Sequence, residues 1–225
     1  FRTPRFEGYR AAMSSDSPFD DFTPATHATL ETVELTTDDG ITISADIETP
    51  ASTQAVAALL HPHPLFGGRR DHPLLLSIAH ALHRNRVTTA RSDFRHASGN
   101  TIEEMPDAIA CCHELQRRHR KLPLVIVGYS FGSIVAARIA SVVGAQHLVM
   151  IAPPLSTVSL EIPATPTTLI IAEHDQFSPP ATISDDPIVK EAGMSIVAGA
   201  DHFLNGHIGT VTELTVGAAS TALGE

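Results

Sequence analysis

The chain has 225 residues, and its 25 acidic and 15 basic side chains give it a formal charge of −10. This length suits a single domain with a multi-layer core, and the excess of acidic residues disfavours nucleic acid and anionic membranes as partners. No stretch approaches the roughly 18–20 consecutive apolar residues of a membrane-spanning helix.

Residues 1–25 mix Pro, Asp, Ser and Arg with isolated aromatic side chains and show no periodicity. We expect a disordered N-terminal tail, the alternative being an arm that packs on a neighbour through Phe19 and Phe22. Met13 would serve as the native start, and residues 26–225 would form the folded domain.

The next segments predict an antiparallel hairpin followed by alternating strands and helices. Apolar residues alternate over 30–37 and 41–47 around an Asp-Asp-Gly turn, which is typical of two half-exposed strands. Farther along, short apolar runs predict buried strands, and helical periodicity predicts helices. The expected strands are 56–60, 87–94, 124–127, 147–152, 168–172 and 194–198, and the expected helices are 73–83, 102–115, 133–140 and 208–218, with a loop and short helix over 179–191. The sequence therefore predicts an α/β fold with a mostly parallel central sheet, helices on both faces and an N-terminal antiparallel hairpin.

The predicted helix over 102–115 has charged residues at both ends. Glu103, Glu104 and Asp107 lie at its start, and four basic residues follow over 117–121. Both groups suit the helix macrodipole, and we interpret them as a solvated helix surface.

The two cysteines of the chain, Cys111 and Cys112, are adjacent in this predicted helix. Adjacent cysteines provide no disulfide framework, which is typical of a reducing compartment, and we expect a cytoplasmic protein. We interpret both as ordinary helix residues, with a redox role as the alternative.

The segment Gly128-Tyr129-Ser130-Phe131-Gly132 is a G-x-S-x-G motif that lies between a predicted strand and a predicted helix. This context is typical of a nucleophile elbow, a sharp turn that exposes the serine hydroxyl at the carboxyl end of the sheet. The two glycines permit a close approach of strand and helix, and the helix N-terminus favours developing negative charge. Ser130 is therefore the candidate nucleophile, the alternative being a structural Gly-Ser turn.

A nucleophilic serine needs a general base, and that base needs a carboxylate to orient it. In this topology the expected order along the chain is serine, acid, histidine. Asp175 and His202 each follow a predicted strand, so both fall at the edge of the sheet where ligands bind. The alternatives for these two are a turn-capping aspartate and a surface histidine. The rival acids are Glu173 and Asp201, and the rival base is His207.

Four motifs in this order resemble those of one group of proteins. They are GYSFG, HPHPLFGG, AEHD with Pro179-Pro180 after it, and GADHF, and they span about Leu30 to the C-terminus. They are similar to the small, lidless α/β-hydrolases related to dienelactone hydrolases. The resemblance implies the α/β-hydrolase fold and a Ser-Asp-His hydrolase, although dienelactone hydrolases proper use cysteine where this chain has Ser130. Relatives also tend to carry a Gly-rich, Arg-containing loop after the fourth strand, which is abbreviated here to 94–100.

Acyl transfer also needs two N–H donors for the oxyanion. The resemblance and the mechanism both assign one donor to Phe131, directly after the nucleophile. The second is expected from the loop over 61–68, where Pro62 and Pro64 have no N–H. His63 is the first choice and Leu65 the second.

Histidines and arginines near this loop allow other interpretations. His61 and His63 could begin a metal site that His72, His80 or His83 completes, but a serine mechanism needs no metal. Arg69 and Arg70 could hold an anionic substrate group or form a solvated surface, and the sequence assigns no role to Arg95.

The connection between the predicted strands 147–152 and 168–172 has no room for a helical lid, so we expect an open, shallow site that takes small soluble esters. The sequence predicts a serine hydrolase of carboxylic esters or thioesters, without a cofactor or metal. The alternatives are the same triad acting on a peptide or C–C bond or transferring the acyl group to another acceptor, and a non-catalytic binding protein on the same fold. The natural substrate and the oligomeric state stay open.

Overall fold

The computed structural model describes residues 29–95, 101–161 and 163–222. The predicted tail over 1–25, with Met13, Phe19 and Phe22, lies outside the described residues, as do 96–100 of the abbreviated loop. In chain order the elements are β1 (Thr29–Thr36), β2 (Thr42–Thr49), β3 (Ala55–Leu60), the 3-10 helix η1 (Pro64–Phe66), α1 (Pro73–Arg84), β4 (Val87–Ser92), α2 (Met105–Arg118), β5 (Leu124–Tyr129), α3 (Phe131–Ile139), β6 (His147–Ile151), β7 (Thr167–His174), α4 (Pro180–Ile183), α5 (Pro187–Glu191), β8 (Gly193–Asp201) and α6 (Ile208–Ala222).

The strands form one sheet in the order β1-β2-β4-β3-β5-β6-β7-β8. The pairings β1–β2 and β2–β4 are antiparallel, and the pairings from β4–β3 to β7–β8 are parallel. Every residue of β3, β4, β5 and β6 is buried, which explains why β3, β5 and β6 are mostly apolar runs and not alternating patterns, whereas β4 buries polar residues as well. The predicted α/β architecture with an N-terminal hairpin is confirmed.

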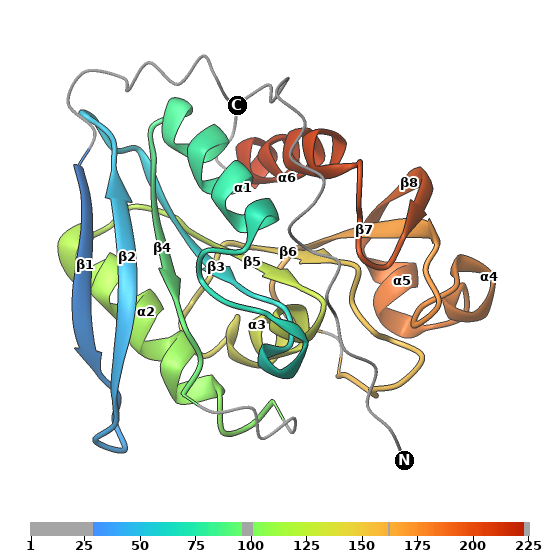
Figure 1. Ribbon diagram of the computed structural model, residues 1–225, viewed down its shortest axis with the longest axis horizontal. Helices are drawn as coiled ribbons and strands as arrows, with labels where there is room; N and C mark the ends of the chain where they lie inside the picture. Colours follow the sequence, from blue (N-terminus) through green and yellow to red (C-terminus); the bar gives the residue numbers. More distant parts are fainter. Residues whose placement is uncertain (1–28, 96–100, 162, 223–225) are drawn as a thin grey trace, which may run out of the picture.

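Helices cover the sheet on two faces, each with its own apolar core (Figure 1). On one face α1 and α6 pack through residues such as Leu75, Ile78 and Val211. On the other face α2 and α3 pack through Cys111, Leu115 and others. Because the sheet is buried between these layers, its carboxyl edge is the part of the parallel strands that is open to a ligand.

Helix α2 begins later than the apolar spacing suggests, and its acidic residues are not all solvated. The helix starts at Met105, with Pro106 in its first turn, where a residue without an N–H is tolerated. Ile102, which the periodicity places on the apolar face, precedes the helix and is 58% exposed. The interpretation of the acidic residues as a solvated surface is wrong for Glu104 and Asp107, which are fully buried.

Asp107 is buried because it is the partner of Arg95, which follows β4. The Arg95 backbone N–H donates to Asp107 Oδ2 at 2.7 Å, and Arg95 Nε donates to Oδ1 at 2.8 Å. The same guanidinium also binds Asp39 in the β1–β2 turn. Burial raises the pKa of the Asp107 carboxyl, and the hydrogen bonds from Arg95 oppose that rise. Arg95 therefore links the hairpin, the end of β4 and α2.

Both cysteines are buried helix residues, as predicted. Burial raises the pKa of the Cys111 thiol to about 12 and raises that of Cys112 well above its ordinary value. Such thiols are poorly reactive at neutral pH. Among the residues that the structure describes, no helix combines the length and apolar character needed to cross a membrane.

Replacing Asp107 tests the linking role of the buried ion pair. Asp107→Ala leaves the Arg95 guanidinium, whose side chain is 8% exposed, with fewer partners, so we expect the free energy of unfolding to fall by about 3 kcal/mol in urea denaturation. Asp185→Ala, which removes the exposed ion pair with Lys190, is the control and should cause no measurable change. Equal effects of the two variants would contradict the assignment.

Candidate active site

The turn from β5 to α3 places Ser130 in a strained conformation at the carboxyl edge of the sheet. Its φ of 51° and ψ of −116° are unfavourable for a side chain with a Cβ. The Ser130 N–H donates to the Ile151 carbonyl of β6 at 2.8 Å, which holds the turn to the neighbouring strand. The side chain is half-buried at the start of α3, with the positive end of the helix dipole behind it.

The two glycines of the motif are required by close backbone contacts. A Cβ on Gly128 would lie 2.4 Å from the Gly132 carbonyl oxygen. A Cβ on Gly132 would lie 2.4 Å from the oxygen of Leu60 and 2.5 Å from that of His61. The turn therefore packs directly on the end of β3, where the loop over 61–68 begins.

The structure brings Ser130, His202 and Asp175 together from the ends of β5, β8 and β7. Ser130 Oγ lies 2.9 Å from His202 Nε2, and His202 Nδ1 lies 3.0 and 2.9 Å from the two carboxylate oxygens of Asp175. Because a carboxylate can only accept, Nδ1 carries the ring proton and Nε2 is free to accept from the serine hydroxyl. Asp175 and His202 are buried, at 1% and 6% exposure. This arrangement can take a proton from Ser130.

Asp175 also caps the turn that follows β7, as the turn-capping interpretation of this residue expects. Its Oδ1 accepts hydrogen bonds from the N–H groups of Phe177 at 2.8 Å and Ser178 at 3.0 Å. The buried Ser178 hydroxyl donates to the Pro153 carbonyl and accepts from the Leu155 N–H at 2.7 Å. The carboxylate is thus held by the loop after β7, which is itself tied to the loop after β6.

Tyr129 is hydrogen-bonded to the backbone of His202. Its hydroxyl donates to the backbone carbonyl of His202 at 2.9 Å, and the Tyr129 side chain is buried. Sequence analysis did not identify Tyr129 or Ser178 as site residues. Their positions next to the nucleophile and after the acid are visible in the sequence, but their partners are distant in the chain.

The rival acid and base residues have other partners. Glu173 accepts from the Gly199 N–H at 2.7 Å and is exposed, and Asp201 accepts from the Phe203 N–H at 3.0 Å. His207 lies directly before α6, and its N–H donates to the Leu204 carbonyl. None of these three is recorded in a hydrogen bond with Ser130 or His202 in the described part of the chain.

The loop after β3 folds back over the turn and carries the expected second oxyanion donor. The rings of His63 and Phe131 are 4.6 Å apart between centroids, so the loop lies against the start of α3. Neither His63 nor Phe131 donates its backbone N–H to another described residue. The Leu65 N–H instead donates to His63 Nδ1 at 3.2 Å. A Cβ on Gly68 would lie 1.9 Å from the Pro62 oxygen, which shows how tightly the loop closes.

His61 is a buried link between this loop and the segment after β4. Its Nδ1 lies 2.7 Å from the Pro62 carbonyl oxygen, and its Nε2 lies 3.1 Å from the Phe94 nitrogen. The carbonyl must accept and the N–H must donate, so His61 is neutral with its proton on Nδ1. Burial lowers the pKa of His61. The residues that the structure describes hold no cluster of three His, Cys, Asp or Glu side chains placed to bind a metal.

The arginines that could bind an anionic substrate have carboxylate partners. Arg70 lies 3.0 Å from both Asp46 and Asp93 and is only 22% exposed, so it is neither solvated nor free. Arg69 forms an exposed pair with Asp71 at 3.4 Å. With Arg95 bound as described above, all three arginines take part in ion pairs of the protein.

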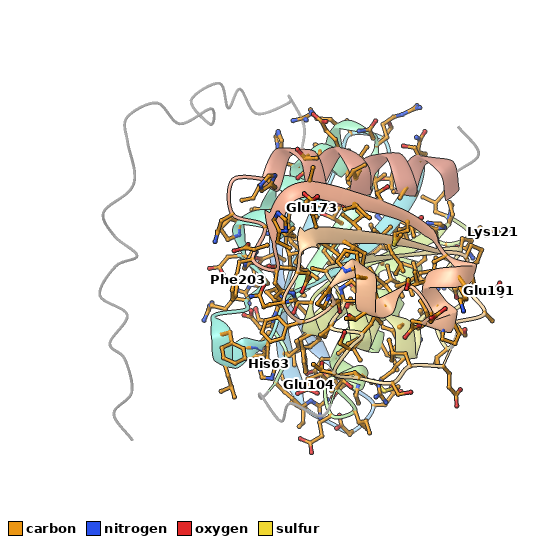
Figure 2. All side chains as sticks on the ribbon, turned by 90° about the vertical axis from the view of Figure 1, so that its right-hand side faces the viewer. His63, Glu104, Lys121, Glu173, Glu191 and Phe203 are labelled. Carbon is orange, nitrogen blue, oxygen red and sulfur yellow. The ribbon has the colours of Figure 1, made fainter. Side chains whose placement is uncertain are left out.

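The half-buried Ser130 is the most exposed residue of the triad. A cavity of about 270 Å³ between β1 and α2 and a second of about 210 Å³ beside α5 include no residue of the triad. The connection over 152–166 has no helix among its described residues, in agreement with the predicted absence of a lid. Figure 2 shows His63 and Phe203 at one edge of the molecule, with Lys121 and Glu191 at the opposite edge.

No family model matches the chain. An uncharacterised protein of Rickettsia prowazekii is 30% identical over 111 residues, which are 46% of this chain and 47% of that protein. The match therefore spans about half the length of this curated relative and suggests no activity.

Comparison with solved structures establishes the fold. An α/β serine hydrolase homologue from Coxiella burnetii is 23% identical, with a TM-score of 0.73 over 82% of this chain and 94% of that one. A lidless α/β serine hydrolase from Xanthomonas campestris is 20% identical, with a TM-score of 0.74 over 82% and 90%. Dienelactone hydrolase from Anabaena variabilis is 16% identical, with a TM-score of 0.69 over 85% and 96%. The chain has the lidless α/β-hydrolase fold.

Because His61 is neutral in the folded protein, we expect the folded protein to become less stable in acid. As the pH falls below about 6.5, the unfolded chain binds a proton that the folded His61 does not, so the free energy of unfolding decreases until the lowered pKa is reached. His61→Gln removes this proton and retains an acceptor for the Phe94 N–H. Its stability should depend less on pH between 6.5 and 5 than that of the wild type, by up to about 1.4 kcal/mol per pH unit in urea denaturation.

His61→Leu is the matched control, because it removes the same proton but leaves the Phe94 N–H without its acceptor. At pH 8 we expect it to be less stable than His61→Gln by about 1–3 kcal/mol. An unchanged pH dependence in both variants would show that His61 is protonated equally in the folded and unfolded states.

Proposed function

We propose that the protein is a serine hydrolase that cleaves small carboxylic esters or thioesters through an acyl-enzyme on Ser130. The observation that carries the proposal is the continuous hydrogen-bonded line from Ser130 through His202 to Asp175. Hydrolases and an esterase among the structures with this fold support the reaction class.

In the first half of the reaction, Ser130 Oγ attacks the carbonyl carbon while its proton passes to His202 Nε2. The imidazolium that forms is stabilised by the buried Asp175 carboxylate. The tetrahedral intermediate then collapses, and the departing alkoxide or thiolate takes the proton from His202. The products of this half are an acyl-enzyme and a free alcohol or thiol.

In the second half, water replaces the alcohol. It gives a proton to His202 Nε2 as its oxygen bonds to the acyl carbon, and Ser130 leaves with that proton. The net reaction consumes one ester or thioester and one water and releases one acid and one alcohol or thiol. Apart from these reactants, the mechanism uses only groups of the chain.

The negative oxygen of each intermediate needs donors that are already in place. We assign these to the N–H groups of Phe131 and His63, which have no described partner, and not to Leu65, whose N–H is used within the loop. The start of α3 adds the positive end of its dipole to the same region.

Ser130→Ala tests the proposal directly. The wild type should react with a fluorophosphonate probe at Ser130 and hydrolyse p-nitrophenyl acetate, because the serine is activated by His202. The variant should lose labelling, and its turnover should fall by about 10³-fold or more. Intact-mass spectrometry and the release of p-nitrophenolate are the measurements.

A native, folded wild type that the probe does not label would favour a non-catalytic binding protein on this fold. Undiminished ester turnover in Ser130→Ala would place the nucleophile elsewhere. Labelling without ester or thioester turnover would favour the same triad acting on another bond or acyl acceptor.

A second prediction separates Asp175 from its rival. Asp175→Asn presents an amide N–H to Nδ1 and favours the wrong histidine tautomer, so kcat should fall by about 10⁴-fold with little change in KM. Glu173→Gln, two residues earlier and exposed, changes a contact with Gly199 and should alter kcat less than about threefold. A larger loss of kcat in Glu173→Gln than in Asp175→Asn would reverse the assignment.

A further inference from the structure

Aromatic side chains gather around Ser130 in two groups. On one side the ring of Phe66 lies 5.3 Å from that of His63, which lies 4.6 Å from Phe131. On the other side the rings of Phe177 and Phe203 lie 4.6 and 5.8 Å from the ring of His202. One group therefore includes Phe131, which follows Ser130 in the chain, and the other surrounds His202, which is hydrogen-bonded to Ser130.

The distribution of phenylalanine over the molecule is uneven. The described part of the chain contains five, at 66, 94, 131, 177 and 203, and every one belongs to this system of ring contacts. Phe94 and Phe131 are buried, but Phe66, Phe177 and Phe203 are 86, 41 and 54% exposed, and the adjacent Leu65 is 73% exposed. Exposed apolar groups that cluster at an active site are typical of a surface that binds an apolar ligand.

The charges near this surface do not favour an anionic ligand. Arg70 and Arg95 are bound by two carboxylates each, and Arg69 is paired with Asp71. Burial lowers the pKa of His63. The negative charge of the nearby Glu104 carboxylate opposes that decrease. Figure 2 shows Glu104 and His63 in the same region of the molecule. Among the described residues near this surface, the three arginines are already bound to carboxylates, so none of them is held in place for a negatively charged substrate.

We propose that Leu65, Phe66, Phe177 and Phe203 form a specificity surface that selects neutral, apolar esters. The inference rests on the proposed function and deepens it by naming the substrate class. Phe177 and Phe203 contact His202, which must protonate the leaving oxygen, so they flank the alcohol part of the ester. Leu65 and Phe66 extend from the loop that holds the second oxyanion donor, so they flank the acyl part.

Substrate pairs of matched length test the charge preference. The enzyme is given p-nitrophenyl hexanoate and the mono-p-nitrophenyl ester of adipic acid, which differ by a terminal carboxylate. We expect kcat/KM for the hexanoate to exceed that for the adipate by at least about tenfold, and to exceed that for p-nitrophenyl acetate by a similar factor. Benzyl acetate should likewise exceed methyl acetate when acid release is followed.

Substitutions on each side separate the two ends of the ester. Phe66→Ser should lower the hexanoate-to-acetate ratio several-fold and leave the benzyl-to-methyl ratio unchanged, and Phe203→Ser should do the opposite. Phe66→Lys should raise kcat/KM for the adipate relative to the hexanoate. Met194→Ser removes an apolar side chain of β8 that is 45% exposed and should leave all three ratios unchanged.

Each outcome decides between the two proposals. Ester turnover that depends on Ser130 but shows no preference for hexanoate over adipate, or ratios that the phenylalanine variants do not change, would overturn the specificity surface alone. Absence of any turnover that depends on Ser130 would overturn the proposed function and the specificity surface with it.

Discussion

The position of a single proton on the His202 ring governs the candidate site. Because both oxygens of Asp175 face Nδ1, the ring proton is held there, and Nε2 is left to accept from Ser130 at 2.9 Å. The carboxylate can hold this orientation because two backbone N–H groups of its own turn bind it. The loops after β6, β7 and β8 thus form one connected support for the imidazole.

A second constraint is the close approach of the nucleophile turn to β3. The carbonyl oxygens of Leu60 and His61 lie within 2.5 Å of where a Cβ on Gly132 would be, so only a glycine here lets the start of α3 lie against the loop after β3. That contact brings the rings of His63 and Phe131 together. His61, buried beneath, joins the same loop to the backbone after β4. One small residue therefore permits the arrangement of the loop relative to the serine.

Near the candidate site, the charged side chains form ion pairs within the fold, whereas several apolar side chains are exposed. The arginines near the site link the hairpin, β4, α2 and the loop after β3 through carboxylates, so they contribute to the fold. The exposed aromatic side chains in ring contact with His63 and His202 are phenylalanines. A site built in this way would discriminate substrates by apolar area and shape, since the ionic groups are already satisfied.

Local patterns in the sequence were enough to predict the alternating strands and helices, the turn at Ser130 and the positions of Asp175 and His202. They suffice because carboxyl ends of parallel strands share one edge, so chain order predicts proximity. The tertiary structure decided what depends on the direction of side chains from distant segments: the burial of Asp107 by Arg95, the bridging role of His61 and the use of the Leu65 N–H by His63. Hydrophobic periodicity predicts which face of a helix or strand is buried, but it does not predict which polar side chain or backbone group of another element will contact that face.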